Sequence, residues 1–364
     1  MAPTNTTWGI FKMHRIPLLL FVLVFAVWSA AAAQGPTIED IQVAIAESGA
    51  QWTADYNEVW DLHQEYGWYS GGMMFPEDMA GIPRYQSLGL KDLPRQLDWR
   101  NKDGKDYIGK ARNQWSCGSC WAFATTGPIE GHFNITEDWP ESDLNLSEQH
   151  LVSCCPFSSG CNGGFTTESF DYAKTWGIVD EECMEYEASD DVACNEKCDN
   201  WQERVVKIDS WELIGDGLGI LFPDPNDIME ALQVGPLGTS LTIYNDLHSY
   251  TGGIYEQTTF IPTGLHAVTI VGYDADEGYW ICKNSWGPGW GEDGYFRIKW
   301  GAAQIGMLTI FPHYTYQGLK PPDPVDDDDD DDDDADDDNG DDWVLPVDDD
   351  GGDDDDDDDG GNCG

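Results

Sequence analysis

Basic residues are scarce in this chain, and their scarcity disfavours one large class of function. The 364 residues include 18 Lys and Arg against 69 Asp and Glu, which gives a formal net charge of −51 at pH 7. Residues 321–364 hold 25 aspartates and no Lys or Arg, yet the remainder of the chain is acidic as well. Nucleic-acid binding needs clustered Lys and Arg against the phosphates, so we expect no nucleic-acid partner.

Long apolar stretches are also missing, apart from one near the N-terminus. Residues 16–33 carry no charge, follow Lys12, His14 and Arg15, and end in alanines. A basic start, an apolar centre and a small-residue end are typical of a secretory signal, so residues 1–33 are predicted to be a cleaved signal peptide. The alternative is a membrane anchor, because the stretch is about as long as the shortest spanning helices. After cleavage no membrane contact is expected.

Export places the chain in an oxidising compartment, where most of its ten cysteines should be paired. One of them, Cys120, has the features of a nucleophile, which leaves an odd number. At least one more thiol must therefore be free or bonded to another chain. The candidates are Cys282, inside the apolar stretch 279–282, and Cys363, near the C-terminus.

One ten-residue segment combines a structural cysteine with a nucleophilic one. Residues 114–123 read Gln-Trp-Ser-Cys-Gly-Ser-Cys-Trp-Ala-Phe, and Cys120 stands where a helix is predicted to begin. Unpaired N–H groups at a helix start favour the thiolate, and a nearby imidazolium favours it further. His266 in Gly-Leu-His-Ala-Val and Asn284 in Lys-Asn-Ser-Trp-Gly supply a base and a group that orients it. Both lie far downstream, so only a folded two-domain arrangement can bring them to Cys120.

The hydrophobic periodicity changes along the main body of the chain. Helices are predicted first, over 121–133, 148–153 and 168–176, with Ser147 capping the second and Thr166 or Thr167 capping the third. A short helix over 228–234 follows, and then β-rich segments over 240–244, 266–273, 279–283, 295–300 and 307–311. A helical half followed by a strand half predicts an α+β fold with a cleft between the halves.

Taken together, these motifs resemble those of the papain-like cysteine peptidases over about residues 93–311. The nucleophile segment, Gly160-Cys161-Asn162-Gly163-Gly164, the segment around His266, and Asn284-Ser285-Trp286-Gly287 occur in the order typical of that family. The resemblance implies a papain-like two-lobed fold, with a helical lobe, a β-barrel-like lobe and the active-site cleft between them.

The resemblance also implies a role for each residue of the constellation. Cys120 would attack the peptide carbonyl as a thiolate, with the His266 imidazolium as its partner and later proton donor to the leaving amine. Asn284 would orient the His266 ring, and Trp286 would shield that contact from water. Gln114 and the backbone N–H of Cys120 would form the oxyanion hole. No cofactor and no metal ion are expected.

Polypeptide substrates are expected to bind beside two glycines. Gly163 and Gly164 allow an extended peptide backbone to approach and pair with theirs. Phe165, Thr239 and Ala267 are predicted to line the pocket for the residue two places before the cut bond, and an apolar preference there is the hypothesis. Two adjacent histidines would indicate an occluding loop, and the sequence has no such pair. Their absence favours endopeptidase action.

Family resemblance further implies a disulfide between Cys117 and Cys161. Five other cysteines are expected to pair among themselves with one left over, namely Cys154, Cys155, Cys183, Cys194 and Cys198. The sequence does not fix their connectivity, and the pairs Cys154 with Cys194 and Cys155 with Cys183 are taken as hypotheses.

The segments around this domain carry separate predictions. Residues 34–92, with one helix over 38–46, are interpreted as a short propeptide that blocks the cleft and is removed near Asp92 or Leu93. Residues 93–316 form the catalytic domain. Residues 317–364 form an Asp-rich tail that cannot bury enough apolar surface to fold. Its predicted role is solubility, or binding of Ca²⁺ or cationic surfaces through carboxylate oxygens.

Two hypotheses of function follow from these features. The first is a secreted, monomeric cysteine endopeptidase made as a zymogen and located outside the cell, in the periplasm or at the cell surface, with an endolysosomal location as the alternative. The second is a non-catalytic secreted binding protein on the same scaffold, with the acidic tail as its working part. Loss of Cys120, His266 or Asn284 would favour the second hypothesis, and all three are present.

Overall fold

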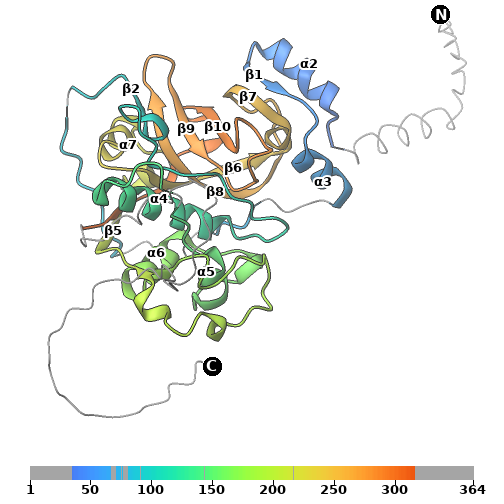
Figure 1. Ribbon diagram of the computed structural model, residues 1–364. Coiled ribbons are helices and arrows are strands. Elements are labelled where there is room, and N and C mark those ends of the chain that lie inside the picture. Colours follow the sequence, from blue (N-terminus) through green and yellow to red (C-terminus); the bar gives the residue numbers. More distant parts are fainter. Residues whose placement is uncertain are drawn as a thin grey trace, which may run out of the picture.

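The main body of the chain and much of the segment before it are described by a computed structural model (Figure 1). The described residues are 35–66, 71–74, 76, 81–90, 92–142, 144–215 and 217–315. The predicted signal peptide, the Asp-rich tail and Cys363 lie outside them. Across the described ranges, the structure has no helix with the length and apolar character needed to cross a membrane.

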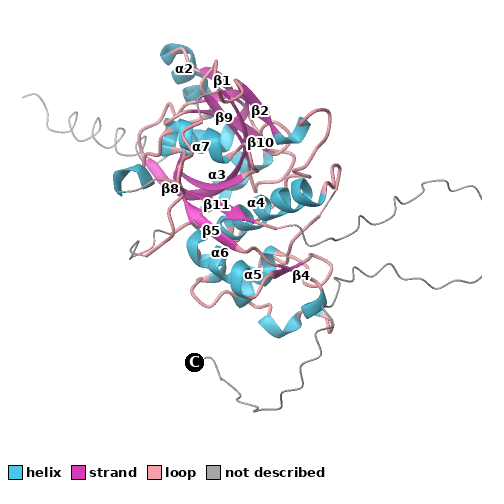
Figure 2. Ribbon diagram, turned by 90° about the vertical axis from the view of Figure 1, so that its left-hand side faces the viewer, coloured by secondary structure: helices cyan, strands magenta, loops and turns pink. Residues whose placement is uncertain are grey.

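The helices fall into groups that follow the chain (Figures 1 and 2). Two precede the main domain: α2 (Ile38–Ser48) and α3 (Glu58–Tyr66). Three build the first lobe: α4 (Cys120–Glu137), α5 (Glu148–Cys154) and α6 (Thr166–Thr175). The short helix α7 (Pro225–Ala231) packs its apolar residues into the core of the second lobe. Helix α3 was not predicted from the sequence.

The caps of these helices only partly follow the sequence. The Ser147 side chain accepts a hydrogen bond from the His150 N–H, as predicted for the start of α5. Helix α6 instead begins at Thr166 after Phe165, without a side-chain cap. The predicted Thr166 or Thr167 cap is therefore wrong, because both threonines lie inside the first turn.

The second lobe is built on one mixed sheet. In the described part of the chain this sheet has nine strands, in the order β1-β7-β10-β9-β8-β6-β11-β5, with β2 paired to β8. Their bounds are β1 (Gln51–Ala54), β2 (Gln96–Asp98), β5 (Ser210–Leu213), β6 (Leu237–Tyr244), β7 (Tyr250–Tyr255), β8 (Pro262–Asp274), β9 (Tyr279–Lys283), β10 (Tyr295–Lys299) and β11 (Met307–His313). A separate pair joins β3 (Ile178–Val179) and β4 (Val205–Val206) in the first lobe.

Two large hydrophobic clusters support the two lobes. One surrounds α4 and includes Trp121, Phe133 and Phe170, and the other lies on the sheet and includes Trp280 and Phe296. Helix α4 packs against β8 and is buried along most of its length. The predicted two-lobed α+β fold is confirmed, and α4 and β8 meet at the boundary between the lobes.

The described parts of the segment 35–90 are docked on both lobes. Strand β1 extends the sheet by pairing antiparallel with β7, and the Trp52 ring packs edge-on against Tyr255 at 5.1 Å between centroids. Further on, the chain returns along β5, where the Tyr85 N–H donates to the Leu213 carbonyl. The Leu90 N–H donates to the buried Glu230 carboxylate at 2.9 Å.

Candidate active site

The predicted nucleophile lies at the boundary between the lobes. Cys120 is the first residue of α4, its side chain is fully buried, and N–H groups of Ala267, Trp121 and Met73 lie against its sulfur. Burial raises the pKa of this thiol to about 12, and these three N–H groups together with the N–H of Cys120 itself oppose the rise. Ala267 belongs to β8, so the strand that carries His266 borders the thiol.

The predicted base is held by a hydrogen bond from one ring nitrogen. His266 Nε2 lies 2.7 Å from Asn284 Oδ1, which also accepts the Ser285 N–H at 2.9 Å. An atom that accepts a backbone N–H must be the amide oxygen, so Nε2 of His266 is the donor. The other nitrogen, Nδ1, is buried without a hydrogen-bond partner in the part of the chain that the structure describes. Burial lowers the pKa of His266 to about 4, and the Asn284 contact opposes this.

Trp286 covers this histidine. Its ring stacks on the His266 ring with centroids 4.9 Å apart and an interplanar angle of 28°. Trp286 is itself buried, which excludes water from the His266–Asn284 contact. This is the position that the family resemblance implied.

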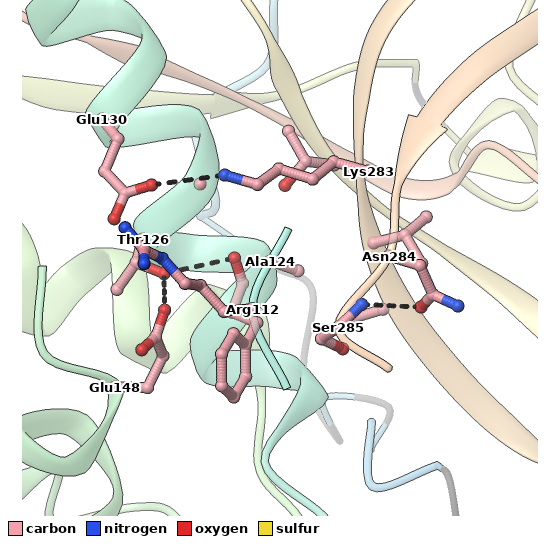
Figure 3. A pocket seen from close by; sticks show the side chains of 13 residues that line it. Arg112, Ala124, Thr126, Glu130, Glu148, Lys283, Asn284 and Ser285 are labelled. Carbon is pink, nitrogen blue, oxygen red and sulfur yellow. Dashed lines mark hydrogen bonds and ion pairs between the residues drawn. The ribbon is translucent and has the colours of Figure 1, made fainter. Parts of the chain in front are cut away.

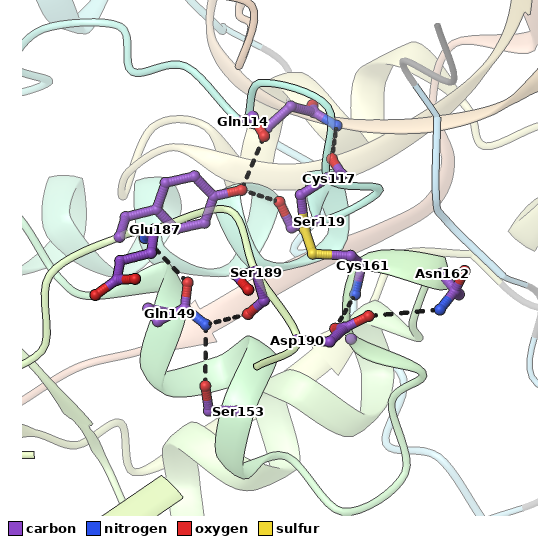
Figure 4. Close-up of a disulfide and its surroundings, with 12 residues drawn as sticks. Gln114, Cys117, Ser119, Gln149, Ser153, Cys161, Asn162, Glu187, Ser189 and Asp190 are labelled. Carbon is purple, nitrogen blue, oxygen red and sulfur yellow. Dashed lines mark hydrogen bonds between the residues drawn. A yellow bond between two sulfur atoms is a disulfide. The ribbon is translucent and has the colours of Figure 1, made fainter. Parts of the chain in front are cut away.

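Gln114 is fixed by contacts at both ends of its side-chain amide. Its Nε2 donates to the Cys117 carbonyl at 2.9 Å (Figure 4), and its Oε1 accepts from Ser285 Oγ at 2.6 Å. A side-chain amide nitrogen has two hydrogens, so one further donor remains on Nε2. Ser285 therefore ties the Gln114 amide to the loop that carries Asn284.

Tyr186 is a contributor to this region that the sequence did not reveal. Its hydroxyl donates to the Gln114 carbonyl at 2.9 Å and lies 2.6 Å from Ser119 Oγ, immediately before Cys120. Its ring packs edge-on against Phe123, one turn into α4. No local motif marks Tyr186, because its partners lie far away in the sequence.

The cleft itself is occupied by residues 71–74. Gly164 donates its N–H to the Gly72 carbonyl at 2.8 Å and accepts from the Met74 N–H at 2.9 Å, while the Gly72 N–H donates to the Leu265 carbonyl. A Cβ on Gly163 would lie 2.6 Å from the Gly72 oxygen. The two predicted cleft glycines thus permit close approach of another backbone, and here that backbone belongs to the segment before the main domain.

The predicted pocket residues differ in their access to this cleft. Ala267 faces the Cys120 sulfur through its N–H, and Phe165 is half-buried at the start of α6. Thr239 is fully buried between β6 and β11, where its hydroxyl lies 2.8 Å from Thr309 Oγ1. Thr239 therefore stands behind the cleft wall in this closed arrangement.

A buried charged cluster lies behind the site, and sequence reasoning missed it (Figure 3). A cavity of about 20 Å³, with room for about one water molecule, is lined by Arg112, Glu130, Glu148 and Lys283 among others. Lys283 Nζ lies 3.7 Å from a Glu130 oxygen, and Thr126 donates to Glu148 at 2.7 Å. Burial, followed by the nearby Glu130 carboxylate, raises the pKa of Glu148. Glu130 belongs to α4, Glu148 to α5 and Lys283 to β9, so this cluster connects the two lobes.

The disulfides agree with two of the three predicted pairs. Cys117 is bonded to Cys161 (Figure 4), and Cys154 is bonded to Cys194, as expected. The predicted pair of Cys155 and Cys183 is wrong. Cys183 is bonded to Cys198, because the turn after β3 brings these two together, and the Cys198 N–H donates to the Cys183 carbonyl at 2.9 Å.

Three thiols are unpaired among the described cysteines: Cys120, Cys155 and Cys282, all buried. Cys282 was one of the two predicted candidates for a free thiol. Burial raises the pKa of Cys155 to about 11, which keeps it in the unreactive thiol form.

Comparison with known proteins identifies the family. The model of the papain family of cysteine proteases matches residues 93–313, and the chain belongs to this family. The oryzain beta chain of Oryza sativa subsp. japonica is 33% identical over 271 residues, which cover 70% of this chain and 54% of the relative. The probable cysteine protease RDL3 of Arabidopsis thaliana is 34% identical over 257 residues, which cover 67% of this chain and 65% of the relative.

Solved structures agree with this assignment. The digestive procathepsin L2 proteinase from Tenebrio molitor larval midgut superposes with a TM-score of 0.65 at 28% sequence identity. The match covers 83% of this chain and 95% of that chain. The chain spans less than two thirds of the length of the two plant relatives, so similarity with them extends over part of each protein.

Proposed function

We propose that this protein is a secreted papain-like cysteine endopeptidase, made as a zymogen, that hydrolyses polypeptides through Cys120 and His266. The observation that carries the proposal is the meeting of three features at the lobe boundary. These are a cysteine at the start of α4, the N–H of Ala267 against its sulfur, and the adjacent His266 ring held by Asn284. The relatives named as cysteine proteases support it.

The chemistry begins with a proton transfer. With the cleft open, the Cys120 proton passes to His266 Nδ1, because Nε2 already carries the hydrogen donated to Asn284. The thiolate then attacks the peptide carbonyl carbon. The oxyanion that forms accepts hydrogen bonds from the Gln114 side-chain amide and from the Cys120 N–H.

Collapse of this intermediate breaks the peptide bond. The C–N bond cleaves, the proton on His266 Nδ1 goes to the leaving amine, and a thioester joins Cys120 to the other fragment. Water then gives a proton to His266 and adds to the thioester carbonyl. Release of the carboxylic acid returns the sulfur and the imidazole to their starting state.

Residues 34–92 are proposed to be the inhibitory propeptide. Residues 71–74 fill the cleft between Gly164 and Leu265, where a substrate backbone would lie. The Met73 N–H lies against the Cys120 sulfur, so this segment covers the nucleophile. The same cover buries the thiol and raises its pKa, so the nucleophile is present but not ionised.

Replacement of Cys120 by Ala tests the proposal. The processed Cys120→Ala protein should fold as the parent does and lose measurable hydrolysis of peptide substrates, while Cys155→Ala, which removes another buried thiol, should keep it. An epoxide thiol-peptidase inhibitor should label Cys120 of the processed parent. Retained turnover in Cys120→Ala would reject the proposal, and a folded parent without turnover would favour the non-catalytic binding protein.

The remaining assignments extend the proposal beyond the site. Residues 93–316 are proposed as the catalytic domain of a monomer, with processing near Asp92 or Leu93 and with residues 1–33 as the export signal. Proteases of this family are typically secreted or lysosomal. For the tail, residues 317–364, we propose a role in solubility, with Ca²⁺ or cationic-surface binding as the alternative, which calorimetric titration of Ca²⁺ into chains with and without the tail would test.

A further inference from the structure

Trp115 is a large aromatic residue at a position whose backbone does not suit one. Its φ is 50°, in the left-handed region, where a bulky residue is an outlier. The Cys117 N–H donates to the Gln114 carbonyl at 3.3 Å and closes a turn in which Trp115 is the first central residue. Gly, Asn and Asp dominate turns that have a positive φ at that place. Backbone preference therefore does not account for a tryptophan here.

Burial in the core does not account for this residue either. Trp115 is 51% exposed, whereas Trp121 and Trp286 are buried. A tryptophan usually stabilises a fold by burying most of its large apolar surface, and about half of this one faces solvent. An exposed bulky residue held at an unfavourable backbone angle points to a contact that forms when a ligand binds.

Hydrogen bonds hold the Trp115 turn firmly in place. The Trp115 N–H donates to Asn113 Oδ1 at 2.9 Å, and the Gln114 N–H donates to the Ser285 carbonyl at 2.8 Å. The Gln114 carbonyl accepts from the Tyr186 hydroxyl at 2.9 Å as well. The Trp115 backbone is therefore fixed relative to Gln114, the proposed oxyanion donor.

The neighbours of this turn show on which side of the nucleophile it lies. Gln114, directly before Trp115, bonds to Ser285, which stands between the residue that holds the imidazole and the ring that covers it. On the other side, two residues after Trp115, Cys117 is bonded to Cys161 beside the cleft glycines. Trp115 is thus nearer to the imidazole side of the site.

The imidazole side is where the leaving group would lie. His266 Nδ1 is proposed to give its proton to the leaving amine, so the residues after the cut bond depart past that ring. The residues before the cut bond are proposed to pair with Gly164, on the opposite side. A peptide backbone fits on the imidazole side as well, because Gly71 lies there with its Cβ position 2.5 Å from the Leu265 carbonyl oxygen.

We propose that Trp115 is a specificity-determining residue, whose indole contacts an apolar side chain in the first two residues after the cut bond. This inference rests on the proposed function and names the kind of polypeptide that the site prefers. An indole offers a broad apolar face, so large aliphatic and aromatic side chains gain more from it than small polar ones. The fixed turn holds this face in place before the substrate arrives, so little conformational entropy is lost on binding.

The test compares matched peptides that differ only after the cut bond. Internally quenched substrates carry Leu, Phe or Ser at the first or the second position after it. For the processed parent, we expect kcat/KM to be about tenfold higher with Leu or Phe than with Ser at one of these positions. Trp115→Gly and Trp115→Asn both suit a positive φ and should reduce this ratio to about twofold, whereas Trp115→Phe should keep most of it.

A matched control and a stability measurement separate this role from a structural one. Trp176→Ala removes another exposed indole, at the end of α6, and should leave the ratio unchanged. Trp115→Gly and Trp115→Asn relieve the backbone, so their melting temperatures should equal or exceed that of the parent. Equal losses of kcat/KM on all peptides, with the ratio unchanged, would mean that the turn only supports Gln114 and would overturn the proposal.

Binding to the processed Cys120→Ala chain gives a readout that needs no hydrolysis. Calorimetry with peptides that span the cut bond should show tighter binding with Leu than with Ser after it, and Trp115→Gly in the same chain should remove the difference. The inference fails if neither assay separates Leu from Ser, or if the separation survives Trp115→Gly. A parent that separates them in binding but hydrolyses neither would reject the proposed peptidase activity and leave the Trp115 contact standing.

Discussion

The two lobes hold their parts of the site in different ways. The first lobe presents Cys120 from the turn that leads directly into α4, and the Cys117–Cys161 disulfide ties this turn to a segment 44 residues further on. The second lobe presents His266 from the 13-residue strand β8, whose position depends on pairing with β6 and β9. A turn and the helix after it therefore set the location of the sulfur, while long-range strand register sets the location of the imidazole.

The largest effect should come from the imidazole of the β lobe. In the processed protein, His266→Ala should lower kcat/KM by about 10⁴-fold, because both the base and the proton donor are lost. Peptide hydrolysis and circular dichroism should be measured together. The half-buried His313, on β11 of the same lobe, provides the control, since His313→Ala should keep the activity of the parent. A loss smaller than tenfold in His266→Ala would mean that β8 does not supply the base.

The second-largest effect should be on the reactivity of Cys120, compared with the propeptide in place and after its removal. With the propeptide in place, the pKa of Cys120 is raised to about 12, so its thiolate is rare at pH 7 and its alkylation should rise tenfold per pH unit between pH 6 and 9. Removal of the propeptide should increase the alkylation rate at pH 7 by about 10³-fold and flatten this pH dependence. Mass spectrometry of iodoacetamide adducts at Cys120 gives both rates. Equal rates in the two states would contradict the role proposed for residues 71–74.

Gln114 should give a smaller loss that separates the oxyanion donor from its support. Gln114→Ala should lower kcat by about 10² to 10³-fold, because one donor to the oxyanion is removed. Ser285→Ala leaves that donor in place and removes only the hydrogen bond to Gln114 Oε1, so its loss should be about tenfold or less. Similar losses in both variants would show that positioning, and not donation, accounts for the effect of Gln114.

The sequence predicted those parts of the molecule that short segments determine. Gln114, Cys120, His266 and Asn284 each stand in a motif of a few residues, and the strands 279–283 and 295–299 follow from β-rich runs bounded by turns. Most of the helices of the first lobe were found within a few residues of their ends. In these cases local composition and the final packing favour the same structure.

What the sequence could not predict depends on the path of the chain between distant residues. The partner of Cys183 is decided by the turn after β3, which brings Cys198 within bonding distance and leaves Cys155 buried and free. Helix α3 packs on η6 (Asn245–Ser249), which lies far away in the sequence, so its contact beside the site could not be predicted. The stacking of His63 on His248 is likewise a result of docking, not of spacing.

Substitution of Tyr186 should give the smallest loss of activity. It tests whether a change confined to the helical lobe leaves the part of the site on the β lobe unaffected. Its hydroxyl contacts the Gln114 carbonyl and Ser119 Oγ, so it positions the oxyanion donor and the start of α4 without touching a reacting atom. Tyr186→Phe keeps the edge-on contact with Phe123 and removes about 1 kcal/mol of hydrogen bonding, equivalent to about fivefold in kcat. We expect kcat to fall. KM should change little, and so should the pH at which the alkylation rate of Cys120 is half-maximal, because the β lobe that carries His266 is unaltered. Steady-state kinetics with Tyr172→Phe as the matched control would detect this, and a change confined to KM would show that Tyr186 acts on substrate binding instead.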